Sequence, residues 1–221
     1  MIEIINVTKK FDEQVILDNV NINIAQNQNV LFVGQNGAGK SSLMKTILGQ
    51  YLPDKGSVSI DGFNPLNDRK KALLNLAFVP QTPPPLKFNL SELMSYVCKS
   101  TNTKESEIYN FCQKLNFDLK QNLKKSFYKL SGGMKQKFLI AIAFARNVDI
   151  MLFDEPMANL DPISRDKFSK LLKEYFRQKS MIFISHRLDE IGGYIDRVIE
   201  MDLGKIIKDE MINGAKDEKF I

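Results

Sequence analysis

The stretch Gly34-Gln35-Asn36-Gly37-Ala38-Gly39-Lys40-Ser41 decides the fold of this 221-residue chain. It follows the apolar run Val30 to Val33, and the segment from Lys40 to Leu48 after it has apolar residues at helical spacing. A strand, a glycine-rich turn and a helix in this order aim backbone N–H groups and the positive end of the helix at one point. The stretch therefore predicts a nucleotide-phosphate site.

The pattern also assigns side chains, because it matches GxxxxGK[ST]. We expect Lys40 to reach the β- and γ-phosphates and the Ser41 hydroxyl to ligate Mg²⁺. The remaining residues expected to surround the phosphates are Gly34, Asn36, Gly37, Ala38, Gly39 and Ser42. The competing interpretation is a structural turn that happens to carry Lys-Ser.

Two more apolar runs end in polar residues. Ile150 to Phe153 leads into Asp154, and Met181 to Ile184 leads into Ser185 and His186. Continuous apolar runs indicate strands covered on both faces, as in a parallel sheet between helices. Ligands of such α/β sheets bind at the carboxyl ends of the strands, so the positions of these polar residues are informative.

Asp154 and Glu155 are adjacent carboxylates directly after a hydrophobic strand. Asp154 is suited to hold Mg²⁺, and Glu155 is suited to orient or deprotonate an attacking water. The plain alternative is that acidic residues often begin a loop. The phosphate loop upstream favours the catalytic interpretation.

The region between Gln81 and about Gln136 differs from the rest in its pattern of apolar residues and prolines. Thr82-Pro83-Pro84-Pro85 cannot continue a central strand, and helical patterns follow from Leu90 and again from Ile108. Asn89 with Glu92 resembles a capping arrangement. We predict one α/β domain, with core segments 1–81 and 137–221, antiparallel β elements near the N-terminus, a closing hairpin around Asp202-Leu203-Gly204, and a helical subdomain at 82–136.

Composition excludes several classes of protein. With 43% hydrophobic residues the chain can bury a core without staples, and Cys98, Cys112 and a single histidine do not make a structural zinc site. The longest apolar run, Phe138 to Ala145, is far below the ~20 residues of a membrane span, and the start does not read as a signal peptide. The net charge of +5 comes almost wholly from lysine, which favours a solvated surface over an anionic membrane surface or nucleic acid as partner.

A second glycine-bearing segment, Leu130-Ser131-Gly132-Gly133-Met134, precedes another apolar helix. Such a helix N-terminus is able to bind phosphate, and the alternative is that Ser131 is only an N-cap. With this segment the chain resembles the ATP-binding-cassette (ABC) ATPase family, whose signature is LSGG followed by Gln or Met. The resemblance covers nearly the whole chain and implies a RecA-like P-loop NTPase core with a mainly parallel sheet.

The resemblance implies further roles. Gln81 looks like the glutamine that senses Mg²⁺ and water, Asp161 in Asn159-Leu160-Asp161 looks like part of the loop that crosses to a second subunit, and His186 looks like the γ-phosphate sensor. Phe11 takes the place of the aromatic that stacks on adenine, with a core aromatic as the alternative. Ser131, Gly132 and Gly133 would contact the ATP of the second subunit.

In this family two cassettes pair head to tail around two ATP, and hydrolysis releases the interface. This chain has Ile142 where many members have Arg, a position that we expect to serve packing. All residues needed for hydrolysis are present, so a non-hydrolysing regulatory module is disfavoured.

The expected partner is a transmembrane permease, which would hold the ATPase at the cytoplasmic face of the membrane. The candidate docking groove is Thr82 to Leu86 with the helix from Leu90 to Val97, although Leu86, Phe88 and Met94 are equally suited to the insert's core. The short chain and the residues that follow the signature resemble those of small export cassettes more than those of importers. The alternative is a soluble ATPase that acts on DNA or ribosomes. The sequence shows neither the long coiled coil expected of the DNA type nor the fused second cassette expected of the ribosome type. The sequence does not name the transported substrate.

Overall fold

The computed structural model describes residues 1–185 and 191–212. Its strands are β1 (Ile2–Phe11), β2 (Gln14–Ile24), β3 (Val30–Val33), β4 (Lys55–Ile60), β5 (Leu76–Val79), β6 (Ile150–Asp154), β7 (Ser180–Ile184), β8 (Arg197–Asp202) and β9 (Lys205–Met211). Its helices are α1 (Lys40–Ile47), α2 (Arg69–Ala72), α3 (Leu90–Thr101), α4 (Glu105–Lys114), α5 (Leu119–Asn122), α6 (Gly132–Ala145) and α7 (Pro162–Tyr175), with 3₁₀ turns η1 (Phe127–Lys129) and η2 (Gly192–Tyr194).

The strands of the described residues form two sheets. The larger has the order β5-β6-β7-β3-β8-β9, in which only the β8–β9 hairpin pairs antiparallel. The smaller, β2-β1-β4, is antiparallel throughout. The predicted α/β class, the mainly parallel sheet and the N-terminal antiparallel elements are confirmed. The predicted hairpin is also present.

Each central strand contributes side chains to two hydrophobic cores, one on each face of the larger sheet. In β6, Met151 and Phe153 pack with the helices, whereas Ile150 and Leu152 pack with α1 and the smaller sheet. Alternate side chains of a strand point to opposite faces, so a strand buried on both has to be apolar throughout. This explains why the runs in the sequence are continuous rather than alternating.

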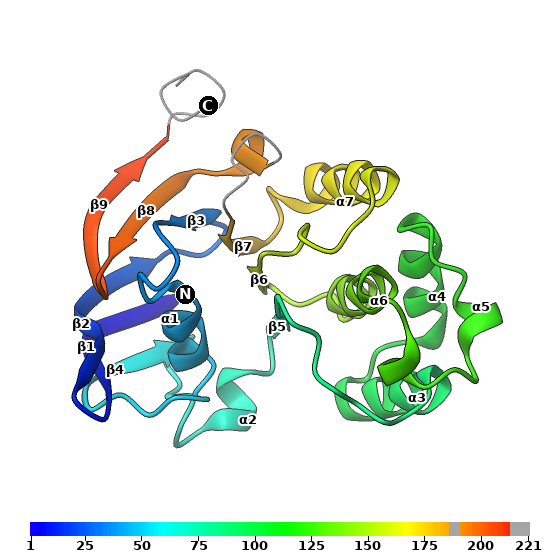
Figure 1. The fold of residues 1–221 in the computed structure, drawn as a ribbon, viewed down its shortest axis with the longest axis horizontal. Coiled ribbons are helices and arrows are strands. Elements are labelled where there is room, and N and C mark those ends of the chain that lie inside the picture. Colours follow the sequence, from blue (N-terminus) through cyan, green and yellow to red (C-terminus); the bar gives the residue numbers. More distant parts are fainter. Residues whose placement is uncertain (186–190, 213–221) are drawn as a thin grey trace.

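The helical subdomain lies to one side of the larger sheet, as Figure 1 shows for α3 to α6. Its first helix begins with the expected capping box, because Asn89 and Glu92 exchange side-chain to backbone hydrogen bonds of 2.9 and 2.8 Å. Helix α6 runs across the expected boundary between residues 136 and 137. Its buried face joins the core of the subdomain to the core of the sheet, since Phe138 and Phe144 belong to one cluster with Phe153.

No helix within 1–185 and 191–212 has the length and apolar character needed to cross a membrane.

Candidate functional site

The carboxyl ends of β3, β5 and β6 converge on a cleft of about 580 Å³. Strand order explains this, because parallel strands present their carboxyl ends at the same edge of a sheet. The loop residues Asn36 to Ser42 line it together with Gln81, Asp154 and Glu155, whereas Gly34 does not. The residues that line it are Gln14, Ile16, Asn36, Gly37, Ala38, Gly39, Lys40, Ser41, Ser42, Gln81, Asp154, Glu155, Ala158 and Ile184.

Gly34 and Gly39 are required by the path of the loop backbone. Both have positive φ, +136° and +101°, in the range that residues with a Cβ rarely adopt. A Cβ at Gly34 would lie 2.1 Å from the carbonyl oxygen of Met201, and one at Gly39 would lie 2.7 Å from that of Ile16. Glycine therefore allows the loop to pass directly against two neighbouring strands.

The β8–β9 turn braces the other side of this loop. The backbone N–H of Gly204 donates to the Ala38 carbonyl at 3.1 Å, and its carbonyl accepts from the N–H of Asp18 at 2.9 Å. A Cβ on Gly204 would meet the Ile16 carbonyl oxygen at 2.5 Å. The loop, β2 and the turn are thus packed backbone to backbone.

Lys40 lies largely buried inside the loop. Its ammonium donates to the carbonyl oxygens of Gly34 at 2.6 Å and Gln35 at 2.9 Å. Burial lowers the pKa of Lys40, and the nearby carboxylates of Glu155 and Asp154 partly offset that effect. The cation is thus held by two carbonyl groups of its own loop.

Ser41 and Asp154 provide two oxygen atoms suited to a magnesium ion. The Ser41 hydroxyl lies 3.4 Å from Asp154 Oδ1, near the separation of about 3 Å expected of neighbouring ligands around Mg²⁺. Asp154 is only 6% exposed, and burial raises its pKa although Ser41, Lys45 and Lys40 oppose the shift. A buried carboxylate beside a hydroxyl is a hard oxygen donor set, so these residues fit Mg²⁺.

Glu155 is placed in the cleft by an unusual backbone conformation. Its φ is +48°, and its N–H donates to the Ile184 carbonyl at 2.9 Å, which anchors the turn to the end of β7. A non-glycine residue in this conformation is uncommon and often marks a functional position. Gln81, which is exposed, faces the same cleft from the end of β5.

The signature segment lies outside this cleft. Ser131 caps α6 by accepting a hydrogen bond from the N–H of Met134 at 3.2 Å. Gly133 packs against the loop after β6, where a Cβ would come within 2.8 Å of the Asn159 carbonyl oxygen. Ser131, Gly132 and Gly133 do not line the cleft of their own chain.

Asp161 is also directed elsewhere. It caps α7 by accepting hydrogen bonds from the N–H and the hydroxyl of Ser164, at 2.9 and 2.8 Å. It also forms an ion pair of 2.9 Å with Lys137. The hydrogen bonds from Lys137 and Ser164 hold the pKa of Asp161 well below its usual range. Within one chain this carboxylate therefore joins α6 to α7.

The predicted adenine-stacking aromatic, Phe11, does not line the cleft. Phe11, 43% exposed at the end of β1, meets the ring of Tyr51 edge-on at 5.0 Å and has the Lys9 ammonium 5.2 Å from its centroid. It is not among the lining side chains. His186 lies outside the described residues.

Sequence reasoning missed Gln14, Ile16 and Ala158, which line the cleft. Gln14 and Ile16 lie on β2, and no motif marks them. Ala158 follows the Asp154-Glu155 pair by a few residues, and proximity to that pair was the available signal.

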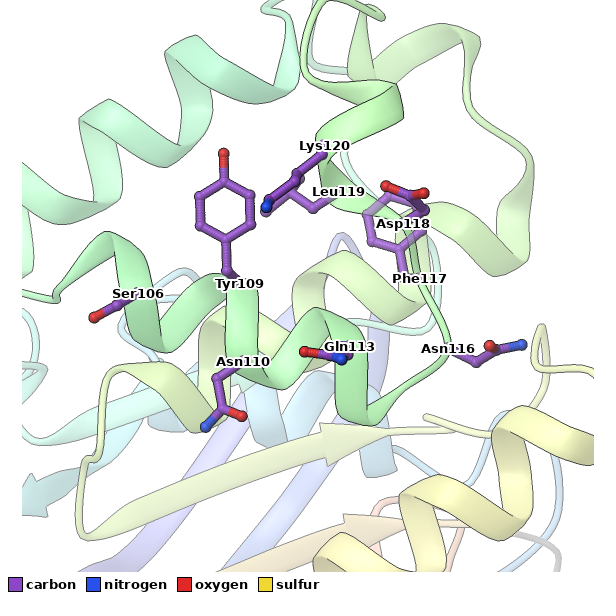
Figure 2. A pocket seen from close by; sticks show the side chains of 9 residues that line it. All are labelled: Ser106, Tyr109, Asn110, Gln113, Asn116, Phe117, Asp118, Leu119 and Lys120. Carbon is purple, nitrogen blue, oxygen red and sulfur yellow. The ribbon is translucent and has the colours of Figure 1, made fainter.

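A second hollow, of about 700 Å³, lies between α4 and α5 (Figure 2). It is lined mainly by amide, hydroxyl and apolar side chains, with Lys120 as its one cation and Asp118 as its one anion. It has no glycine-rich loop, so the phosphate chemistry belongs to the first cleft.

The chain is similar to known proteins in sequence and in fold. The family model described as ABC transporter matches residues 17–158. The zinc import ATP-binding protein ZnuC of Psychrobacter cryohalolentis is 34% identical over 204 residues, which are 90% of this chain and 79% of that protein. An ABC transporter ATP-binding protein of Bartonella henselae is 30% identical, over 93% of this chain and 91% of that protein.

Among solved structures, a dimeric ATP-binding cassette in a post-hydrolysis state bound to ADP and Pi superposes with a TM-score of 0.82. It is 26% identical to this chain, and the match covers 97% of this chain and all of the cassette.

Proposed function

The chain belongs to the ABC transporter family of ATP-binding proteins, and from this premise we propose that it hydrolyses ATP in the cleft below the phosphate loop, with Mg²⁺ as cofactor. One observation carries the proposal. Four segments far apart in the sequence, the loop, Gln81, Asp154 with Glu155, and the end of β7, meet in this cleft.

The side chains divide the work by their chemistry. Lys40 and the loop N–H groups, with Gly34, Asn36, Gly37, Ala38, Gly39 and Ser42, hold the phosphates. Ser41, Asp154 and Gln81 hold Mg²⁺, which would neutralise phosphate charge. Glu155 orients or deprotonates the attacking water, since a carboxylate in the cleft beside bound phosphate is placed for that task.

We further propose that two cassettes pair head to tail, so that Ser131, Gly132 and Gly133 of one chain reach the ATP of the other. Two observations support this: the signature lies outside its own cleft, and a related cassette has been solved as a dimer with ADP and Pi. Phe11, His186 and Asp161 keep their proposed roles in adenine stacking, γ-phosphate sensing and the subunit interface.

A transmembrane permease is the proposed partner, and it would hold this chain peripherally at the cytoplasmic face of the membrane. The proposed subdomain of residues 82–136 carries the docking face. There Phe88 is 58% exposed, whereas Met94 is buried and Leu86 packs against the core. Phe88, with the segment from Thr82, is thus available to a partner, and Met94 serves the subdomain's own core.

Export is our first proposal for the direction of transport. It is based on the residues that end the signature and follow it, Gly133-Met134-Lys135-Gln136-Lys137. Import is the second candidate, favoured by the relative named for zinc import. The transported substrate would be bound by the permease and not by this chain.

The decisive experiment searches the neighbouring reading frames for a multi-span membrane protein, co-expresses it with the chain and reconstitutes the complex in liposomes. ATP-dependent transport supports the proposal, and its direction separates export from import. ATP turnover that no membrane partner stimulates would exclude the transporter role.

A further inference from the structure

Asn159 lies between two parts of the site that are distant in the sequence. Its side-chain amide nitrogen donates to the backbone carbonyl of Gln81 at 3.3 Å. Its own carbonyl oxygen would lie only 2.8 Å from a Cβ added to Gly133. One residue thus contacts both the end of β5 and the N-terminus of α6.

Contacts on either side of Asn159 follow the same route. Gln136 of α6 is fully buried and donates to the Pro80 carbonyl at 3.5 Å, one residue before Gln81. Lys137, the next residue, forms the ion pair with Asp161. Helix α6 is therefore tied to the Gln81 segment and to the loop that carries Asn159.

We propose that Asn159 is a positioning residue that fixes the backbone of Gln81 to the N-terminus of α6, so that the two move as one unit within a chain. The inference rests on the proposed function, because it concerns how Gln81 is held at the nucleotide. Gln81 faces the nucleotide of its own chain, whereas Gly133 is proposed to reach that of the second subunit. Asn159 then links the two nucleotide sites through one residue.

The chemistry of the contact predicts which substitutions break it. A carbonyl accepts hydrogen bonds and does not donate them, so only the amide nitrogen of Asn159 can serve. Asn159→Asp preserves the shape of the side chain and places an acceptor against the Gln81 carbonyl. A donor role therefore makes Asp more damaging than Ala, whereas a role in packing alone makes the isosteric Asp milder.

The first test is independent of activity. Hydrogen–deuterium exchange is measured on peptides covering residues 76–90 in wild type, Asn159→Ala, Asn159→Asp and Asn110→Ala. Asn110 is an exposed asparagine on α4 and is the matched control. Faster exchange is expected in both Asn159 variants and not in the control. Unchanged exchange in folded Asn159 variants would overturn the proposal.

Gly133→Ala approaches the contact from the other side. The added methyl group has to displace the Asn159 carbonyl, while alanine favours the helix more than glycine does. The same rise in exchange at residues 76–90 is expected. It provides a second test if an Asn159 variant does not fold, and no change there counts against the proposal.

Steady-state kinetics supply the functional test. Loss of one neutral hydrogen bond predicts a fall in kcat of about three- to tenfold, larger for Asp than for Ala. The KM for ATP should stay within about twofold, because Asn159 does not line the cleft. A rise in KM alone, or Asp milder than Ala, contradicts the donor role. Near-normal turnover of Gln81→Ala would contradict the proposed role of Gln81 but leave the exchange test of Asn159 intact.

Discussion

The ammonium of Lys40 donates a hydrogen bond of 2.6 Å to the carbonyl oxygen of Gly34, six residues earlier in the same loop. The loop thus holds its cation in place through its own backbone. A phosphate that enters the loop has to compete with this carbonyl for the ammonium, so binding exchanges one partner of Lys40 for another.

Lys40→Ala should reduce the affinity for ATP by at least about 100-fold, because charge-assisted hydrogen bonds contribute about 1.5–3 kcal/mol each. Titration of a fluorescent ATP analogue measures the change. Lys55→Ala, at an exposed position on β4, is the control and should bind normally. Equal binding by both variants would remove the phosphate loop from the proposal.

Glu155→Gln should keep ATP binding, accumulate an ATP-dependent dimer and lose roughly 10²-fold or more of turnover, since the amide does not act as a base. Phosphate release and size-exclusion chromatography with ATP measure the two effects. Near-normal hydrolysis would show that Glu155 is not part of the mechanism.

Asp154→Asn should stabilise the fold in the absence of Mg²⁺ while abolishing activity. Burial raises the pKa of Asp154 in the folded chain, so its charge opposes folding at neutral pH. For a raised acid pKa this cost is absent below the usual value of 3.8 and present above the folded value. Thermal melts should show a higher Tm for the variant at pH 7 and convergence with wild type in acid. A lower Tm at pH 7 contradicts this account.

Asp161→Asn should destabilise the chain at neutral pH, because it leaves the buried Lys137 without its anion. The depressed pKa of Asp161 means that its contribution is present above 3.8 and lost as pH falls below that value. Urea unfolding at several pH values should show the difference from wild type shrinking in acid. Asp161→Ala also removes the α7 cap, which adds about 1 kcal/mol, or about 2–4 °C in Tm.

The cysteines should differ in reactivity. Burial raises the pKa of Cys112 to about 12, and it also raises that of the half-buried Cys98, helped by Glu105. Ellman's reagent at pH 8 should modify Cys98 slowly in the folded chain and Cys112 only after denaturation. Cys98→Ser should therefore show no reaction before unfolding.

Most of what could be predicted from the sequence concerned the central strands and the residues at their carboxyl ends. β3, β6 and β7 are buried on both faces, and that requirement leaves continuous apolar runs in the sequence. Residues that follow such runs, such as Asp154, had to lie at the same edge of the sheet. The capping box of Asn89 and Glu92 was equally visible, because it is local.

The smaller sheet could be anticipated only in outline. Asn6 and Asn19 have positive φ, and the β1–β2 pairing shifts register between Ile4 and Lys9, which disrupts the alternation that identifies strands. The contact between Asn159 and Gln81 joins residues 78 apart. No local pattern specifies such a pair, because it depends on how two loops pack after the sheet has formed.

Gly204 has a consequence for how the chain tolerates change. It lies outside the phosphate-loop motif, yet its backbone closes against Ala38 and Ile16 as tightly as the loop glycines close against their neighbours. In a library of random single substitutions, position 204 should be depleted of functional variants to the same degree as positions 34 and 39. The mutational footprint of the phosphate loop therefore extends to a hairpin turn more than 150 residues downstream.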